Sequence, residues 1–261
     1  MRASLDPEAA SLFLDSLDAL GSSGVPFLVG GAYAFQRYTG VTRHTRDFDV
    51  FVRRNDVVRA LAALERMGLQ TELTFEHWLG KAHRSPWYVD VIFGSGNGAA
   101  PVDDLWFQHA VPDETLGVPV ELVPAEEMIW SKSYIMERER FDGADVVHLL
   151  RARAQQLDWD RLLTRFARHP AVLLVHLLLF GFVYPDQRDR VPERVMEKLW
   201  DAARATPSPG DRLCYGTVLS RLQYLTDLTK WGYRDARLEP DGNMTGEQVA
   251  LWTQAGLDQE L

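Results

Sequence analysis

The most strand-like segment of the chain carries a carboxylate at its centre. Residues 87–93 read WYVDVIF, an aromatic and β-branched run followed by the turn residues GSGNG, so we expect a β-strand that contains Asp90. A carboxylate is rarely buried without a partner, because the desolvation of an unpaired charge is very costly. Asp90 must therefore be compensated by a metal ion, by a proton, or by an arginine such as Arg43 or Arg46.

A second strand-like segment, DFDVFV at 47–52, carries aspartates at alternate positions. Side chains two residues apart on a strand point to the same face, so Asp47 and Asp49 share one face and the apolar residues between them face the core. Two carboxylates on one face repel each other unless a cation lies between them. Metal ions held by such carboxylates serve in-line phosphoryl transfer. The alternative is a solvated strand face that carries two acids.

A glycine pair, Gly30-Gly31, separates the apolar strand predicted at 27–29 from a helix predicted for AYAFQRY. Without Cβ atoms the backbone can approach a ligand closely, and the start of the following helix favours phosphate through its free N–H groups and its dipole. An ordinary turn is the alternative for such a pair. The flanking residues fit neither G-x-G-x-x-G nor G-x-x-x-x-G-K-[ST], which argues against Rossmann and P-loop folds.

The chain changes character at Pro124. Before it, segments of strand and helix type alternate, and after it helical patterns follow one another with no further convincing strand. We therefore predict an α/β domain over 1–123 and a helical domain over 124–261, with a polar, loosely held tail from Arg234. The predicted strands are 27–29, 47–52, 71–76, 87–93 and 117–123, and the predicted helices are 7–20, 32–38, 55–68, 125–138, 144–156, 158–168, 171–183, 191–204 and 211–231.

The bulk composition narrows the range of partners. Hydrophobic residues make up 46% of the 261 residues and charged residues 25%, which is typical of a globular protein. The net charge of −9 and the pI of about 5.3 argue against duplex DNA and leave tRNA or a partner protein open. The longest apolar run, 171–184, is too short to cross a membrane. With a single cysteine, Cys214, and no signal-peptide pattern, we expect a cytoplasmic protein.

Three segments together resemble a known superfamily. FLVGGAYA, RHTRDFDVFV and YVDVIF are similar to segments of the nucleotidyltransferases, which include DNA polymerase β, aminoglycoside nucleotidyltransferases and minimal antitoxin-type transferases. The stretch RHTRDFD is similar to the R-x-T-x-D-x-D form of AbiEii-type toxins and small antibiotic-modifying transferases. The resemblance covers about residues 25–95. It implies an α+β fold, with a nucleotidyltransferase-like mixed sheet and flanking helices, followed by the helical C-terminal domain.

The resemblance also implies a site. Asp47, Asp49 and Asp90 would ligate Mg²⁺ or Mn²⁺, and the triphosphate of an NTP would bind at the Gly30-Gly31 turn. Ala32 stands where many relatives carry a serine, which leaves one phosphate hydrogen bond without its donor.

Polar and cationic residues complete the predicted nucleotide site. Arg43, Thr45 and Arg46 lie immediately before the D-x-D strand, where the arginines would neutralise triphosphate charge. A second segment, EEMIWSKSYIMERERFDGADVVHLL, is similar to the segment that follows the catalytic sheet in AbiEii-like transferases. By that likeness Lys132 would reach the nucleotide phosphates, and a structural role is equally open.

The same likeness implies that Arg140, Asp142 and Asp145 brace the two halves of the protein. The alternative for the two aspartates is structural, because they fit the N-cap and the first turn of the helix predicted at 144–156. For His148, and for His176 in the apolar helix, we expect structural hydrogen bonds.

Together these residues predict a metal-dependent nucleotidyltransferase that transfers NMP from an NTP in a cleft between the two domains. The acceptor stays open between a small hydroxyl compound, a tRNA end and a protein side chain. One alternative is a non-catalytic nucleotide-binding or antitoxin-like module of the same fold. Another is a metal-dependent phosphohydrolase, although such enzymes usually add histidines near their acids and only His44 lies close in the sequence.

Overall fold

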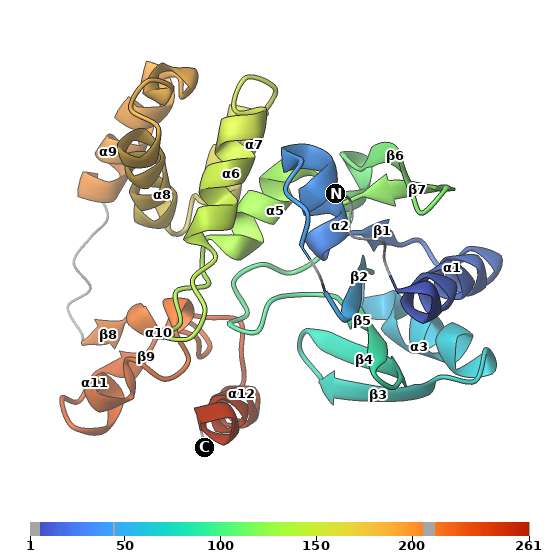
Figure 1. The fold of residues 1–261 in the computed structure, drawn as a ribbon. Helices are drawn as coiled ribbons and strands as arrows, with labels where there is room; N and C mark the ends of the chain where they lie inside the picture. The colour runs from blue at the N-terminus through green and yellow to red at the C-terminus, as the bar shows by residue number, and fades with distance from the viewer. Residues whose placement is uncertain (1–5, 44, 206–211, 261) are drawn as a thin grey trace. The chain divides into compact units, whose positions relative to one another are not determined.

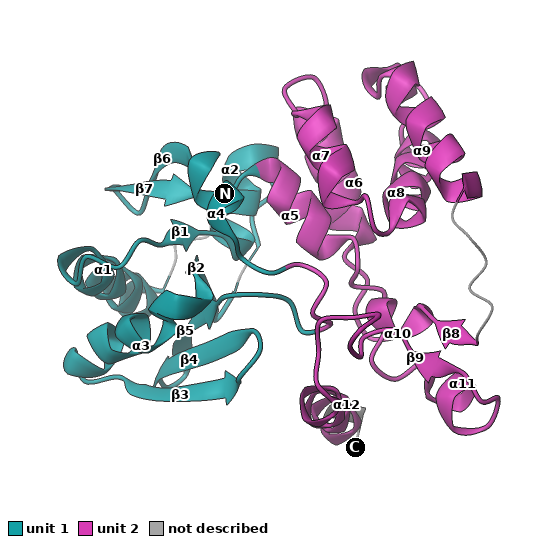
Figure 2. Cartoon of the chain, turned by 180° about the vertical axis from the view of Figure 1, so that it is seen from behind, with its two compact units in different colours: residues 1–96, 101–124 teal, residues 97–100, 125–261 magenta. Residues whose placement is uncertain are grey.

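The computed structural model describes residues 6–43, 45–205 and 212–260, so His44 lies outside the described residues. The chain divides into two compact units (Figure 2). Unit 1 comprises the residues up to 96 together with 101–124, and unit 2 comprises 97–100 together with the residues from 125 onwards. The main boundary between the two units falls at 124/125, and the short segment 97–100 belongs with unit 2.

Unit 1 is built on a mixed sheet that has seven strands among the described residues, in the order β3-β4-β5-β2-β1-β7-β6 (Figure 1). Strand β2 runs parallel to β5, β1 runs parallel to β7, and the other neighbours are antiparallel. The α+β fold class with a mixed sheet is therefore confirmed. The strands are β1 (Leu28–Val29), β2 (Asp47–Phe51), β3 (Gln70–Phe75), β4 (Leu79–Arg84), β5 (Trp87–Ile92), β6 (Val111–Thr115) and β7 (Val118–Leu122).

Helices α1 (Pro7–Ser22) and α3 (Val57–Arg66) pack against one face of this sheet (Figure 1). Helix α1 begins where Asp6 accepts a hydrogen bond from the backbone N–H of Glu8 at 2.8 Å. The face that these helices cover is apolar, and the ring of Phe13 stacks on that of Phe48 with centroids 4.9 Å apart. The other helical elements of unit 1 are α2 (Gly31–Thr39), η1 (Arg54–Asp56) and α4 (Asp104–Gln108).

Three elements of unit 1 were not predicted from the sequence. Strand β4 has the sequence LGKAHR, which lacks β-branched residues, and it forms because β3 and β5 pair with it on both sides. Strand β6 contains Pro112 and lies at the edge of the sheet, the position where a strand tolerates proline. Helix α4 has only five residues, too few for a periodic pattern.

Unit 2 is mostly helical, and two predictions for it are wrong. The single helix predicted at 211–231 is replaced, among the described residues, by strand β8 and the short helices α10 and α11. The tail that we predicted to be loosely held contains strand β9 and helix α12. The elements are α5 (Ala125–Lys132), α6 (Gly143–Arg153), α7 (Trp159–Arg165), α8 (Pro170–Val183), η2 (Arg188–Arg190), α9 (Glu193–Ala205), β8 (Leu213–Cys214), α10 (Gly216–Leu219), α11 (Leu225–Thr229), β9 (Arg234–Asp235) and α12 (Gly246–Glu260).

A buried ionic cluster ties α5 to α7. Arg161 forms ion pairs with Glu126 and Glu127, each at 2.7 Å, and Arg165 contacts Glu127 at 3.1 Å. Two acids and two arginines compensate one another, which is the condition for keeping such charges inside a protein. Within the part of the chain that the structure describes, no helix combines the length and the apolar character that crossing a membrane requires.

Candidate metal and nucleotide site

The three aspartates singled out from the sequence lie together on unit 1. Strand β5 is the parallel neighbour of β2, and Asp49 is directly paired with Asp90 across the two strands. One carboxylate oxygen from each of Asp47, Asp49 and Asp90 lies within 4.8 Å of the others. Asp47 and Asp49 are partly exposed and Asp90 is 9% exposed, so the cluster opens on the sheet face opposite α1 and α3. Carboxylate oxygens at this spacing suit a hard divalent cation such as Mg²⁺.

Asp90 has a cationic partner, and it is neither Arg43 nor Arg46. The ammonium of Lys81, on β4, donates to Asp90 Oδ1 at 2.6 Å. Burial raises the pKa of Asp90 above its ordinary value, Lys81 opposes this, and the nearby charge of Asp47 adds to it. The ion pair that the sequence left open therefore exists, but its cation comes from a strand that the sequence did not predict.

Tyr88 is a second residue that the sequence did not single out. It is paired with Asp47 across β2 and β5, and its ring lies 4.3 Å from the Lys81 ammonium. Burial raises the pKa of Tyr88, and the negative charges of Asp47, Asp90 and Asp49 add to that effect. No local sequence signal marks Lys81 and Tyr88, because their places beside Asp90 and Asp47 come from the register of β4, β5 and β2.

The glycine pair lies directly beside the acids. Helix α2 begins at Gly31, and the N–H of Gly30 donates to the carbonyl of Asp49 at 3.0 Å. A Cβ atom at Gly30 would overlap the ring of Phe51, and one at Gly31 would overlap the carboxylate of Asp49. Gly31 also has a φ of +51°, in the left-handed region that favours glycine. The turn therefore brings the start of a helix, where backbone N–H groups lack intrahelical partners, next to the carboxylate of Asp49.

The segment before β2 places the other predicted nucleotide residues near the acids. The Thr45 hydroxyl accepts a hydrogen bond from the N–H of Asp47 at 3.3 Å, which fixes the start of the strand. Arg46 has an exposed side chain, and its carbonyl accepts from the N–H of Tyr88 at 3.2 Å. The guanidinium of Arg43 lies over the ring of Phe35, 4.7 Å from its centroid. The cationic side chains of Arg43 and Arg46 thus lie immediately before the D-x-D strand.

Lys132 belongs to unit 2, where two buried carboxylates hold its ammonium. It lies 2.7 Å from Asp142 and 2.9 Å from Asp145, and Arg140 adds two hydrogen bonds of 2.9 Å to Asp142. Burial disfavours ionisation of Asp142, but the hydrogen bonds from Arg140 and the charge of Lys132 outweigh it and lower its pKa to about 2. The network joins α5 to the start of α6. A phosphate-binding role for Lys132 stays a prediction.

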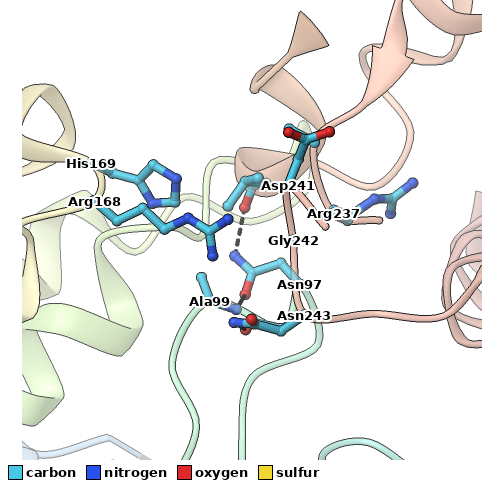
Figure 3. Close-up of a pocket in the computed structure, with 11 residues that line it drawn as sticks. Asn97, Ala99, Arg168, His169, Arg237, Asp241, Gly242 and Asn243 are labelled. Carbon is cyan, nitrogen blue, oxygen red and sulfur yellow. Dashed lines mark hydrogen bonds between the residues drawn. The ribbon is translucent and has the colours of Figure 1, made fainter. Parts of the chain in front are cut away.

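Two further features of unit 2 do not involve the predicted site. His176 is 1% exposed and its Nε2 lies 2.9 Å from the carbonyl of Ser133, which is the structural hydrogen bond that we expected. A small hollow is lined by Asn97, Arg168, His169 and Asn243 among others, and the side chain of Arg168 points toward Asn97 (Figure 3). None of the residues predicted for the site lines this hollow within the described chain.

The sheet, the D-x-D strand and the glycine turn define a protein of the nucleotidyltransferase class. Residues 17–180 match a family described as uncharacterised nucleotidyltransferase, and the chain belongs to this family. No curated protein matches the chain.

Several solved structures are similar to parts of the chain. The solution structure of the antibiotic-resistance factor ANT(2'')-Ia is 18% identical with a TM-score of 0.45, and the match covers 66% of this chain and 97% of that one. The lincosamide antibiotic adenylyltransferase LnuA, lincomycin-bound, is 16% identical with a TM-score of 0.40, covering 53% and 94%. JHP933 from Helicobacter pylori is 14% identical with a TM-score of 0.37, covering 77% and 97%.

Proposed function

We propose that this protein is a divalent-metal-dependent nucleotidyltransferase that moves NMP from an NTP to a hydroxyl acceptor. The observation that carries the proposal is the cluster of Asp47, Asp49 and Asp90, whose ligand atoms lie within 4.8 Å of one another. Beside it the Gly30-Gly31 turn opens helix α2 against Asp49. Carboxylates next to a helix start provide, on one sheet face, ligands for a cation and N–H donors for phosphate.

The three aspartates would hold Mg²⁺ or Mn²⁺, which when bound neutralises charge that develops on the phosphate oxygens. The N–H groups at the start of α2 would bind triphosphate oxygens. Arg43 and Arg46 would offset phosphate charge, and Thr45 would hold Asp47 in place through the hydrogen bond that it accepts. Lys132 is the remaining candidate for the β- and γ-phosphates.

The reaction would be an in-line displacement at the α-phosphorus. The acceptor oxygen forms a bond to this phosphorus, and the bond to the bridging oxygen of the β-phosphate breaks, so pyrophosphate leaves. The acceptor hydroxyl loses its proton in the same step, and a carboxylate of the Asp47, Asp49 and Asp90 cluster would take it, with Asp90 as the candidate. The acceptor class stays open between a small hydroxyl compound, a tRNA end and a protein side chain.

The decisive experiment incubates the protein with each of the four NTPs, labelled at the α-phosphate, with MgCl₂ or MnCl₂. Three acceptors are tested in separate reactions: total tRNA, the protein itself, and a panel of polyhydroxyl compounds. We expect label transfer to one acceptor with release of pyrophosphate, and no transfer by Asp49→Asn. The exposed variant Asp104→Asn, on the same unit, is the matched control and should retain transfer.

The other outcomes separate the alternatives. Release of inorganic phosphate without label transfer would make the protein a phosphohydrolase. Metal-dependent NTP binding with no product from any acceptor would favour a nucleotide-binding module. Nucleotide binding that Asp49→Asn leaves unchanged would place the nucleotide away from the carboxylate cluster and overturn the proposal.

A further inference from the structure

A row of charged side chains crosses four strands of the unit 1 sheet. Glu72 on β3 is paired with Lys81 on β4, Lys81 with Asp90 on β5, and Asp90 with Asp49 on β2. Directly paired residues of neighbouring strands project from the same face, so the four side chains stand side by side. Gly31 lies against Asp49 beyond the end of the row. Along the row the charges are negative, positive, negative and negative.

The position of Lys81 in this row is well defined. Its ammonium is 2.6 Å from Asp90 Oδ1 and 4.3 Å from the centroid of the Tyr88 ring, and its side chain is 21% exposed. A lysine on an open surface keeps its rotamer freedom. The ammonium of Lys81 is instead held by the Asp90 carboxylate and by the face of the Tyr88 ring. Tyr88 is in turn paired with Asp47 across β5 and β2, so Lys81 and Tyr88 lie beside two of the three acids.

We infer that Lys81 is a positioning residue that holds the carboxylate of Asp90 in the orientation of a metal ligand. The inference rests on the proposed function, because it assigns Lys81 to the same metal site. Carboxylates that bind metals are themselves hydrogen-bonded by outer partners, whose loss typically costs 10- to 100-fold in metal affinity. Lys81 supplies such a hydrogen bond to one oxygen of Asp90.

A rival role predicts the opposite sign. If Lys81 were only a counter-ion that fills the cluster until a metal displaces it, its removal would take a positive charge away from a cation site. Coulomb repulsion would then fall, and the metal would bind as tightly as before or more tightly. A positioning residue predicts weaker metal binding despite the lost repulsion. The direction of the change therefore separates the two roles.

The test measures Mn²⁺ binding to the full chain without nucleotide, from the loss of the electron paramagnetic resonance signal of the free ion. For Lys81→Met we expect the dissociation constant for Mn²⁺ to rise about 10- to 100-fold. Lys81→Arg keeps the charge and a donor, and we expect it to recover a part of the affinity. Lys198→Met removes an exposed lysine that pairs with Asp160 at 3.3 Å, and it should bind Mn²⁺ like the wild type.

Asp49→Asn is measured in parallel to separate two kinds of failure. If the wild type binds no Mn²⁺, or if Asp49→Asn binds it like the wild type, the metal site of the proposed function fails and the role of Lys81 fails with it. If Asp49→Asn loses the ion while Lys81→Met binds it as tightly as the wild type or more tightly, only the role of Lys81 is overturned.

A second measurement needs no variant, and so it holds even if Lys81→Met does not fold. The chain has four lysines, Lys81, Lys132, Lys198 and Lys230, so their acetylation rates can be followed separately by mass spectrometry of peptides. We expect Lys81 to react slowly without metal and to stay slow in saturating Mn²⁺, because it remains bound to Asp90. A rise in its rate toward that of the exposed Lys198 when Mn²⁺ binds would show displacement and overturn the inference.

Discussion

The carboxylate of Asp49 occupies the space that a side chain at Gly31 would need. Gly31 opens helix α2 and Asp49 lies on β2, and the N–H of neighbouring Gly30 donates to the Asp49 carbonyl at 3.0 Å. The turn that the sequence assigns to phosphate and the strand that it assigns to metal are thus in van der Waals contact. A substitution in the turn is therefore expected to affect a ligand on the strand, and a substitution in the strand to affect a ligand at the turn.

This contact predicts the effect of Gly31→Ala. The new methyl group must displace the Asp49 carboxylate, so we expect Mn²⁺ binding to weaken about tenfold or more, as when the support of a metal ligand is lost. Left-handed backbone at a residue with a Cβ atom costs roughly 1–2 kcal/mol in addition. Gly40→Ala is the matched control, because Gly40 has a φ of +74° at the other end of α2 and open space around it. Equal Mn²⁺ affinity of the two variants would contradict the prediction.

The double variant Asp47→Asn/Asp49→Asn tests whether the D-x-D pair is functional or structural. Removing two like charges on one face relieves repulsion, so we expect the metal-free protein to unfold at no lower urea concentration than the wild type. At Mn²⁺ a hundredfold above its dissociation constant the wild type gains about 2.7 kcal/mol, and the variant gains nothing. Asp15→Asn/Asp104→Asn, at two exposed positions of the same unit, should behave like the wild type. A large loss of metal-free stability would instead make the pair structural.

Strands with a strong local pattern were predictable from the sequence, and strands stabilised by their neighbours were not. WYVDVIF and DFDVFV are rich in β-branched and aromatic residues, so β5 and β2 lie within one residue of the predicted bounds. In LGKAHR the inward positions hold Gly80 and Ala82, which carry little strand propensity. Strand β4 exists because it completes hydrogen bonding between β3 and β5, and this is tertiary information.

The candidate site divides in the same way. Asp47, Asp49, Asp90 and the Gly30-Gly31 turn were found because each breaks an apolar pattern within its own segment. Lys81 was missed because its proximity to Asp90 depends on strand register, which places the two residues opposite each other on two antiparallel strands. For Lys132 the sequence left two roles open. The contacts of its ammonium with Asp142 and Asp145 support the structural role.

Lys132→Met should therefore destabilise the protein whether or not Lys132 also binds a ligand. The substitution removes a cation from two carboxylates whose side chains are 9% and 4% exposed, and breaking such a buried pair costs on the order of 3–5 kcal/mol. Urea unfolding followed by tryptophan fluorescence measures the loss, with the exposed Lys230→Met as control. If Lys132 also binds the β- and γ-phosphates, the folded variant will lose more affinity for ATP than for AMP. Equal loss for both nucleotides would place Lys132 away from these phosphates.

The last prediction concerns the dependence of stability on pH through Asp142. Its pKa is lowered to about 2 in the folded protein, because the hydrogen bonds of Arg140 and the charge of Lys132 outweigh burial. In the unfolded chain an aspartate titrates near its ordinary pKa of about 3.9. A carboxylate with a lowered folded pKa contributes stability above the unfolded value and loses it as pH falls through the folded value.

The stabilisation from Asp142 is thus complete above about pH 5, and it fades between about pH 4 and pH 2. The shift corresponds to a contribution on the order of 2 kcal/mol at neutral pH. We expect Asp142→Asn to be less stable than the wild type by about this amount at pH 7, and the difference to shrink as pH falls below 4.

Asp160→Asn provides the control, since the pKa of Asp160 is also lowered by ion pairs but its side chain lies in solvent, where such pairs stabilise little. Urea unfolding of the three proteins from pH 7 down to pH 3 measures the effect. A difference between Asp142→Asn and the wild type that stays constant over this range would show that Asp142 stabilises α6 through shape and hydrogen bonding, and that its charge contributes nothing.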